Sequence, residues 1–132
     1  MPIATAPDVE AALIARLGTH PDVIALGVHV SWQLDDRRPA LVVARAGGLT
    51  VVRGWLYQPR VQIDVYAPVR AAAVQAALTA QAVLELRGGW MDATTVVTDV
   101  TTVLAPTWLY DPSADGHRYT ASYLVTAHPR PS

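Results

Sequence analysis

The pattern of hydrophobic and polar residues changes abruptly in the middle of the chain. Val61, Ile63 and Val65 alternate with polar neighbours, which is the two-residue period of a strand with one buried face. The alanine-rich residues 69–87 follow, and their composition is typical of a long helix that ends at the glycine pair 88–89. The sequence therefore predicts a strand that leads directly into a helix.

This predicted helix has no polar face. Its large apolar residues fall on several sides of a helical wheel, and Val83 and Leu84 lie away from Leu78. Its few polar residues are scattered. Because a helix that is apolar all round is usually covered on more than one side, we expect one face to pack on a sheet. A second face, which includes Val83 and Leu84, is expected to contact another subunit.

Similar patterns predict the remaining elements. A first helix is expected at about residues 7–17, with Thr5 as its N-cap and Gly18 closing it. Residues 106–116 read as a loop, and residues 129–132 as a short disordered tail. We expect strands at residues 24–34, 40–45, 49–57, 61–66, 94–105 and 117–127.

This order, α-β-β-β-β-α-β-β, predicts an α+β fold. We expect a mostly antiparallel sheet of about four to six strands with both helices on one face. The length of 132 residues favours a single domain that covers the whole chain.

Composition excludes several classes of function. Hydrophobic residues make up 52% of the chain and charged residues 16%, which excludes a disordered protein. A net charge of −1 gives no electrostatic basis for gripping nucleic acid or a membrane surface. The chain has no cysteine, no signal-peptide pattern and no apolar run of membrane-spanning length. We therefore expect a soluble protein of the cytoplasm.

One cluster resembles the start of a calcium-binding loop. Asp111, Ser113 and Asp115 supply oxygens at the first, third and fifth places, and Gly116 takes the sixth. The twelfth place should carry a glutamate, but Ser122 occupies it. A polar turn is therefore the favoured interpretation, with a small metal-dependent enzyme that uses residues 111–117 as the alternative.

Nucleophilic catalysis has little support. Ser113, Asp115 and His117 have the residue types of a catalytic triad, but three residues of one turn seldom reach the required geometry. The four histidines are dispersed and lack metal-binding spacing. We expect a protein that is not an enzyme and that has no catalytic, cofactor-binding or metal-binding residues.

Asp64 stands in the middle of a predicted strand. Its carboxylate is expected either to face solvent or to pair with Arg45, Arg53 or Arg60 on a neighbouring strand. The run Trp55, Leu56 and Tyr57 is a candidate exposed hot spot for a partner, which would also suit a monomeric adaptor protein.

Six segments, in order, resemble the tail terminator proteins of long-tailed phages, especially those that infect actinobacteria. The similarity covers about residues 7–127, whereas residues 51–57 and 90–94 match no family pattern. The segments are ALVVARAGG (40–48), RVQIDVYA (60–67), the helix from Arg70 to LRG (86–88), VTDV (97–100), PTWLYD (106–111) and RYTASYLVT (118–126).

The resemblance implies a homo-oligomer, a hexameric ring at the head-proximal end of the virion tail. Such a ring caps the tube of major tail protein, stops its polymerisation and presents a surface to the head–tail connector. Genomic DNA passes through the lumen without specific binding. The family offers no catalytic residues, and Asp64 and Arg70 of its motifs join the candidate interface residues. A head-closure or other tail-completion protein is the alternative role.

Overall fold

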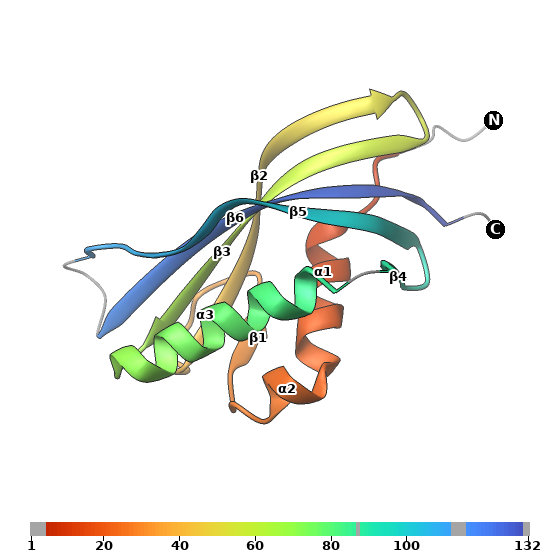
Figure 1. Ribbon diagram of the computed structural model, residues 1–132. Coiled ribbons are helices and arrows are strands. Elements are labelled where there is room, and N and C mark those ends of the chain that lie inside the picture. The colour runs from red at the N-terminus through yellow and green to blue at the C-terminus, as the bar shows by residue number, and fades with distance from the viewer. Residues whose placement is uncertain (1–4, 87, 112–115, 131–132) are drawn as a thin grey trace.

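The computed structural model describes residues 5–86, 88–111 and 116–130. It has an α+β fold in which six strands form one curled, mixed sheet (Figure 1). The sheet order is β1-β2-β3-β6-β5-β4; β1 runs parallel to β2, and the other neighbours are antiparallel. The elements are α1 (Val9–Thr19), α2 (Pro21–Ile24), β1 (His29–Ser31), β2 (Ala40–Val52), β3 (Leu56–Ala67), α3 (Arg70–Leu84), β4 (Trp90–Met91), β5 (Thr95–Trp108) and β6 (His117–Pro129).

The strand-to-helix unit is confirmed and builds the core. On β3, Val61, Ile63 and Val65 are buried beneath the helices, while the residues between them point to the opposite face. α3 contacts β3, β5 and β6, and α1 contacts β1, β2 and β5, so both helices cover one face of the sheet (Figure 1). Alanines of α3 lie within this core, and their small size lets the helix approach the strands closely: Ala73, Ala76, Ala77 and Ala80.

The first helix begins and ends later than predicted. Asp8, rather than Thr5, is its N-cap, because the Asp8 carboxylate accepts a hydrogen bond from the Ala11 N–H at 3.1 Å. Gly18 lies inside α1 instead of closing it. The long helix is shorter than predicted, since α3 spans Arg70–Leu84 rather than residues 69–87.

The strand predicted at residues 24–34 is wrong. Pro21 occupies the first turn of α2, and the His20 ring accepts a hydrogen bond from the Asp22 N–H at 3.2 Å, so this segment starts as a helix. Gly27 then turns the chain at φ 69°, and only the three residues of β1 join the sheet. The observed order is therefore α-α-β-β-β-α-β-β-β.

The strand predicted at residues 40–45 and the start of the strand predicted at 49–57 form one continuous strand, β2. β2 runs without a break through Gly47 and Gly48, whose positive φ angles form a bulge instead of ending the strand. Pro59 lies inside β3, opposite Gly48, instead of separating two strands. At the other edge of the sheet, β5 extends through Pro106, which had been assigned to a loop.

The C-terminal tail was also predicted to begin too early. Pro129 belongs to β6, and the backbone N–H of Arg130 donates to the Thr94 carbonyl at 2.9 Å. Residues 131 and 132 of the predicted tail lie outside the described residues.

Candidate functional site

Val83 and Leu84 do not form a free surface. Their exposed fractions are 3% and 1%, and both pack into the core beneath the sheet. Leu78 and Leu86 are each 51% exposed, so the outer side of α3 is the side opposite to the one predicted. Any partner that covers α3 must therefore contact Leu78 and Leu86 rather than Val83 and Leu84.

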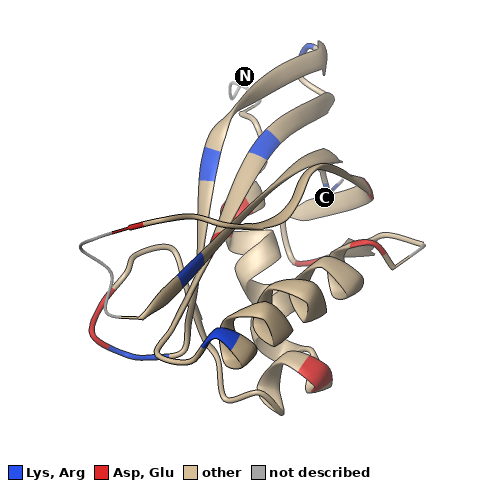
Figure 2. Cartoon of the chain, turned by 60° about the vertical axis from the view of Figure 1, so that its left-hand side comes forward, with Lys and Arg blue, Asp and Glu red and all other residues tan. Residues whose placement is uncertain are grey.

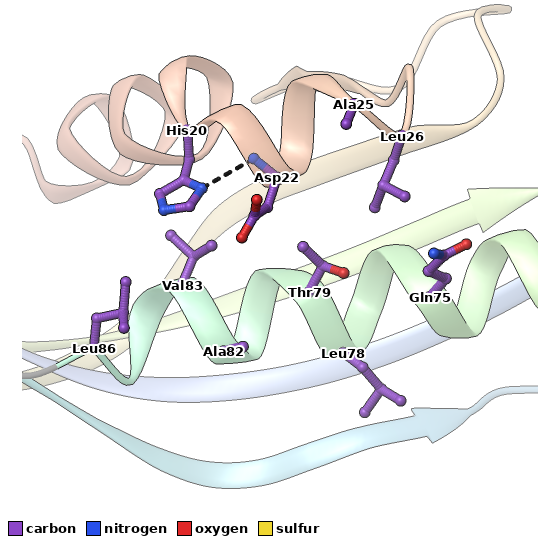
Figure 3. A pocket seen from close by; sticks show the side chains of 10 residues that line it. All are labelled: His20, Asp22, Ala25, Leu26, Gln75, Leu78, Thr79, Ala82, Val83 and Leu86. Carbon is purple, nitrogen blue, oxygen red and sulfur yellow. Dashed lines mark hydrogen bonds between the residues drawn. The ribbon is translucent and has the colours of Figure 1, made fainter.

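A shallow groove of about 570 Å³ lies between α2 and α3. Figure 3 shows Leu26 from the α2 side and Thr79 and Val83 from α3 pointing toward each other across it. Asp22 is the only carboxylate among the lining residues, and no cluster of acids or bases converges there. The groove is an apolar depression with little polar chemistry. Its lining is His20, Asp22, Ala25, Leu26, Gln75, Leu78, Thr79, Ala82, Val83 and Leu86.

The three residues of the predicted hot spot, 55–57, differ in how far they are exposed. Trp55 is 46% exposed, Leu56 is half-buried, and Tyr57 is buried between β2 and β6. The Trp55 ring stacks on the His128 ring with centroids 4.4 Å apart. Trp55 is therefore the member of the three that presents a large exposed surface, and its orientation is fixed by β6.

Trp55 belongs to a larger exposed feature that we call the β2–β3 arm, residues 44–56. From Ala44 to Val52 every residue of β2 is exposed, because the arm extends beyond the helices (Figure 1). Its charged residues are Arg45 and Arg53, and it has no acidic residue. The arm exposes four large apolar side chains: Leu49, Val51, Val52 and Trp55.

A second exposed feature, the β5 arm of residues 99–110, was not predicted from the sequence. Here β5 and the residues after it lie at the opposite edge of the sheet from β2. Its only charged residue is Asp99. The sequence predicted a strand at residues 94–105 and a loop at residues 106–116, with no indication that the segment would be exposed. The exposed large apolar residues are Val103, Leu104, Trp108, Leu109 and Tyr110.

Asp64 is paired, but with none of the three arginines predicted. Arg118 on β6 donates to the Asp64 carboxylate at 3.1 Å and to the Asp111 carboxylate at 3.0 Å. Burial opposes the charge of Arg118, but Asp64 and the hydrogen bonds to both carboxylates raise its pKa above the usual value. The guanidinium also lies over the Tyr66 ring, and burial together with Asp64 raises the pKa of the Tyr66 hydroxyl.

Arg70 is exposed at the first residue of α3. A cation there is not favoured by the helix dipole, and no acidic residue occupies the first turn. Arg70 lies at the end of α3 that is remote from Leu86, so it does not extend the exposed surface around that residue. The whole of β3 lies between Trp55 and Arg70 along the chain, and the two residues lie at opposite ends of that strand.

The loop considered for calcium or catalysis lies largely outside the described residues, including Ser113 and Asp115. Asp111 and His117 are described, and Asp111 binds Arg118. Among residues 5–86, 88–111 and 116–130, no group of three or more His, Asp or Glu side chains is arranged to hold a metal ion.

Comparison of the sequence with models of known protein families finds no match, and comparison with curated proteins finds none either. Within the described part of the chain, no helix has both the length and the hydropathy needed to cross a bilayer.

Proposed function

We propose that this chain is a tail terminator subunit of a long-tailed phage, which assembles as a homo-oligomeric ring and caps the tail tube. The observation that carries the proposal is the presence of two separate apolar arms at opposite edges of one sheet. A subunit of a closed ring needs two different surfaces that complement each other, because each copy contacts one neighbour with each surface. The six ordered segments that resemble tail terminator proteins support this specific role.

The open face of the sheet also supports this function. Gln58 bonds Thr126 at 3.2 Å, and Gln62 bonds the Asp64 carboxylate at 3.1 Å, so polar groups on this face are paired with each other. Arg118 is neutralised by two carboxylates. A lumen through which DNA slides should hold phosphates only weakly, and this face has few cations: Arg118 is paired with carboxylates, and Arg60 is exposed on β3.

The test is the oligomeric state of the purified chain and its affinity for tube ends. Light scattering should give a discrete oligomer, and electron microscopy of tail tubes mixed with the protein should show a ring on one end. The ring is also expected to halt the addition of further tube subunits. A chain that stays monomeric both alone and with tubes overturns the proposal. Binding to the connector but not to the tube would indicate the neighbouring role of a head-closure protein.

A further inference from the structure

The two arms present strand edges that no other strand covers within the described residues. β1 pairs only with Ala40, Leu41 and Val42 of β2, so the rest of that edge has no neighbouring strand. β4 pairs only with Val96 and Val97 of β5, so β5 is equally uncovered from Asp99 onward. Unpaired N–H and C=O groups along a strand edge are a template for another strand. Because these edges lie on opposite sides of the sheet, they do not meet within one chain.

The charges of the two segments are opposite in sign. Residues 44–60 contain three arginines and no acidic residue, whereas residues 88–111 contain three aspartates and neither lysine nor arginine. In Figure 2, the parts of β2 and β3 that extend beyond the helices carry basic residues (blue) and no acidic residue (red). The charged residues are Arg45, Arg53 and Arg60 in the first segment and Asp92, Asp99 and Asp111 in the second, of which Asp111 is paired with Arg118 of its own chain. Opposite charge attracts these segments to each other and discourages each from pairing with itself.

From these observations we infer that the free edge of β2 in one copy pairs in antiparallel fashion with the free edge of β5 in the next copy. This inference rests on the proposed ring, for which it names the contact. The direction follows from the topology: β2, β3, β6 and β5 alternate in direction, so β5 runs opposite to β2. Neighbouring copies with a common orientation therefore bring antiparallel strands together.

The register irregularities limit where the pairing can occur. β2 is regular over Gly48–Thr50 and β5 over Asp99–Thr102, with bulges on either side of each stretch. Bulges twist an edge away from a partner strand. Across the sheet, Leu49 lies in the same row as Gln58, and Asp99 is paired with Thr126 of β6. The side chain of Gln58 bonds that of Thr126, so Leu49, Gln58, Thr126 and Asp99 lie in one row across the sheet. If the next copy continues the sheet without a shift in register, its Asp99 lies next to Leu49.

Cysteine cross-linking tests this contact in the full chain, which has no native cysteine. A Leu49→Cys chain is mixed with an Asp99→Cys, Thr101→Cys or Val103→Cys chain and oxidised. A disulfide needs Cα atoms about 4.4–6.8 Å apart, so one of the three mixtures should give a covalent heterodimer, in up to about half of its protein if the two chains assemble at random. Leu49→Cys alone should give none, because a head-to-tail contact does not place β2 against itself. Leu78→Cys, which is comparably exposed on α3, is the matched control partner.

Charge reversal gives an independent measurement. Arg53→Glu and Asp99→Arg should each weaken self-association at low ionic strength, and a chain that carries both changes should associate more strongly than either single variant, because the two segments again have opposite charges. Asp36→Arg, the same charge change in an exposed loop, should leave association unchanged.

The results separate the contact from the function. A protein that caps tail tubes but cross-links through Leu49→Cys alone, or to Leu78→Cys rather than to β5, overturns the pairing and leaves the terminator function in place. A protein that neither self-associates nor binds tubes overturns both. Cross-linking between β2 and β5 without tube capping would support the contact and remove the terminator function.

Discussion

Arg118 on β6 donates a hydrogen bond to Asp64 on β3 at 3.1 Å, although 54 residues separate them in sequence. The same guanidinium holds Asp111, so one cation joins two strands to the segment that follows β5. Replacement by methionine should leave two largely buried carboxylates without their cation. We expect Arg118→Met to lower the free energy of unfolding by about 2–3 kcal/mol.

Urea denaturation at neutral pH measures this loss. Asp111→Asn, which keeps the bond between Arg118 and Asp64, is the matched control and should cost less than half as much. Equal losses in the two variants would show that the bond to Asp64 contributes nothing.

Tyr123 carries a buried hydroxyl for which no hydrogen-bond partner is found among the described residues. Because an unpaired buried polar group is unfavourable, Tyr123→Phe should raise the free energy of unfolding by about 1 kcal/mol. Thermal melting of the parent protein and of Tyr123→Phe at neutral pH measures this change. A decrease of similar size would instead reveal a partner for the hydroxyl.

The same residue predicts alkaline behaviour. Burial, with a smaller contribution from Glu85, raises the pKa of Tyr123 above its ordinary value. Since the pKa is higher in the folded protein, this group's contribution to stability is complete below pH of about 10 and is lost as the pH rises further. Unfolding free energies at a series of pH values should therefore fall less steeply above pH of about 10 in Tyr123→Phe than in the parent protein.

Two leucines on α3 should respond differently to an aspartate. Leu84 is buried, so Leu84→Asp should cost about 3–5 kcal/mol and abolish folding at moderate temperature. Leu78 is half-exposed, so Leu78→Asp should leave the melting temperature within a few degrees of the parent value. Circular dichroism melts distinguish the variants, and equal melting temperatures would contradict the assignment of the two helix faces.

Gly48 should be intolerant of a side chain. Its φ is 120°, and a Cβ atom there would collide with the backbone of Gln58 and Pro59 on β3. We expect Gly48→Ala to destabilise the β2–β3 arm by about 2 kcal/mol. Gly47→Ala is the matched control, because its φ is also positive but no atom lies within 4 Å of its Cβ position. Amide hydrogen exchange of residues 49–53 should accelerate more in Gly48→Ala; similar rates in both variants would exclude the collision.

The sequence predicted the strand-to-helix unit because its alternation is regular and one face is buried. It did not predict which side of α3 is inside, because small residues rather than the largest apolar ones make up most of the buried side. The buried stripe is made of alanines at positions i, i+3, i+4 and i+7, starting at Ala73, and Val83 and Leu84 continue it. Leu78 lies off this stripe and is therefore on the outside of the helix.

Other features depend on contacts that no local pattern encodes. The alternation of residues 24–34 is compatible with a strand, but Pro21 and the His20 cap start a helix just before it. Gly47 and Gly48 look like a strand end, and pairing with β3 makes them a bulge. The partner of Asp64 lies on a strand far away in sequence, so the three nearby arginines were the wrong candidates. Exposure of the β5 arm likewise follows from the reach of the helices rather than from its own composition.

Glu10 of α1 accepts a hydrogen bond from the backbone N–H of Arg45 at 3.0 Å. Because α1 already binds this N–H, a second strand that pairs with β2 cannot use it. The helix thus acts as a stop that fixes how far a second strand can slide along β2. A sheet edge with such a stop accepts only a short partner in a narrow range of registers, which disfavours the indefinite stacking of strands that leads to fibres.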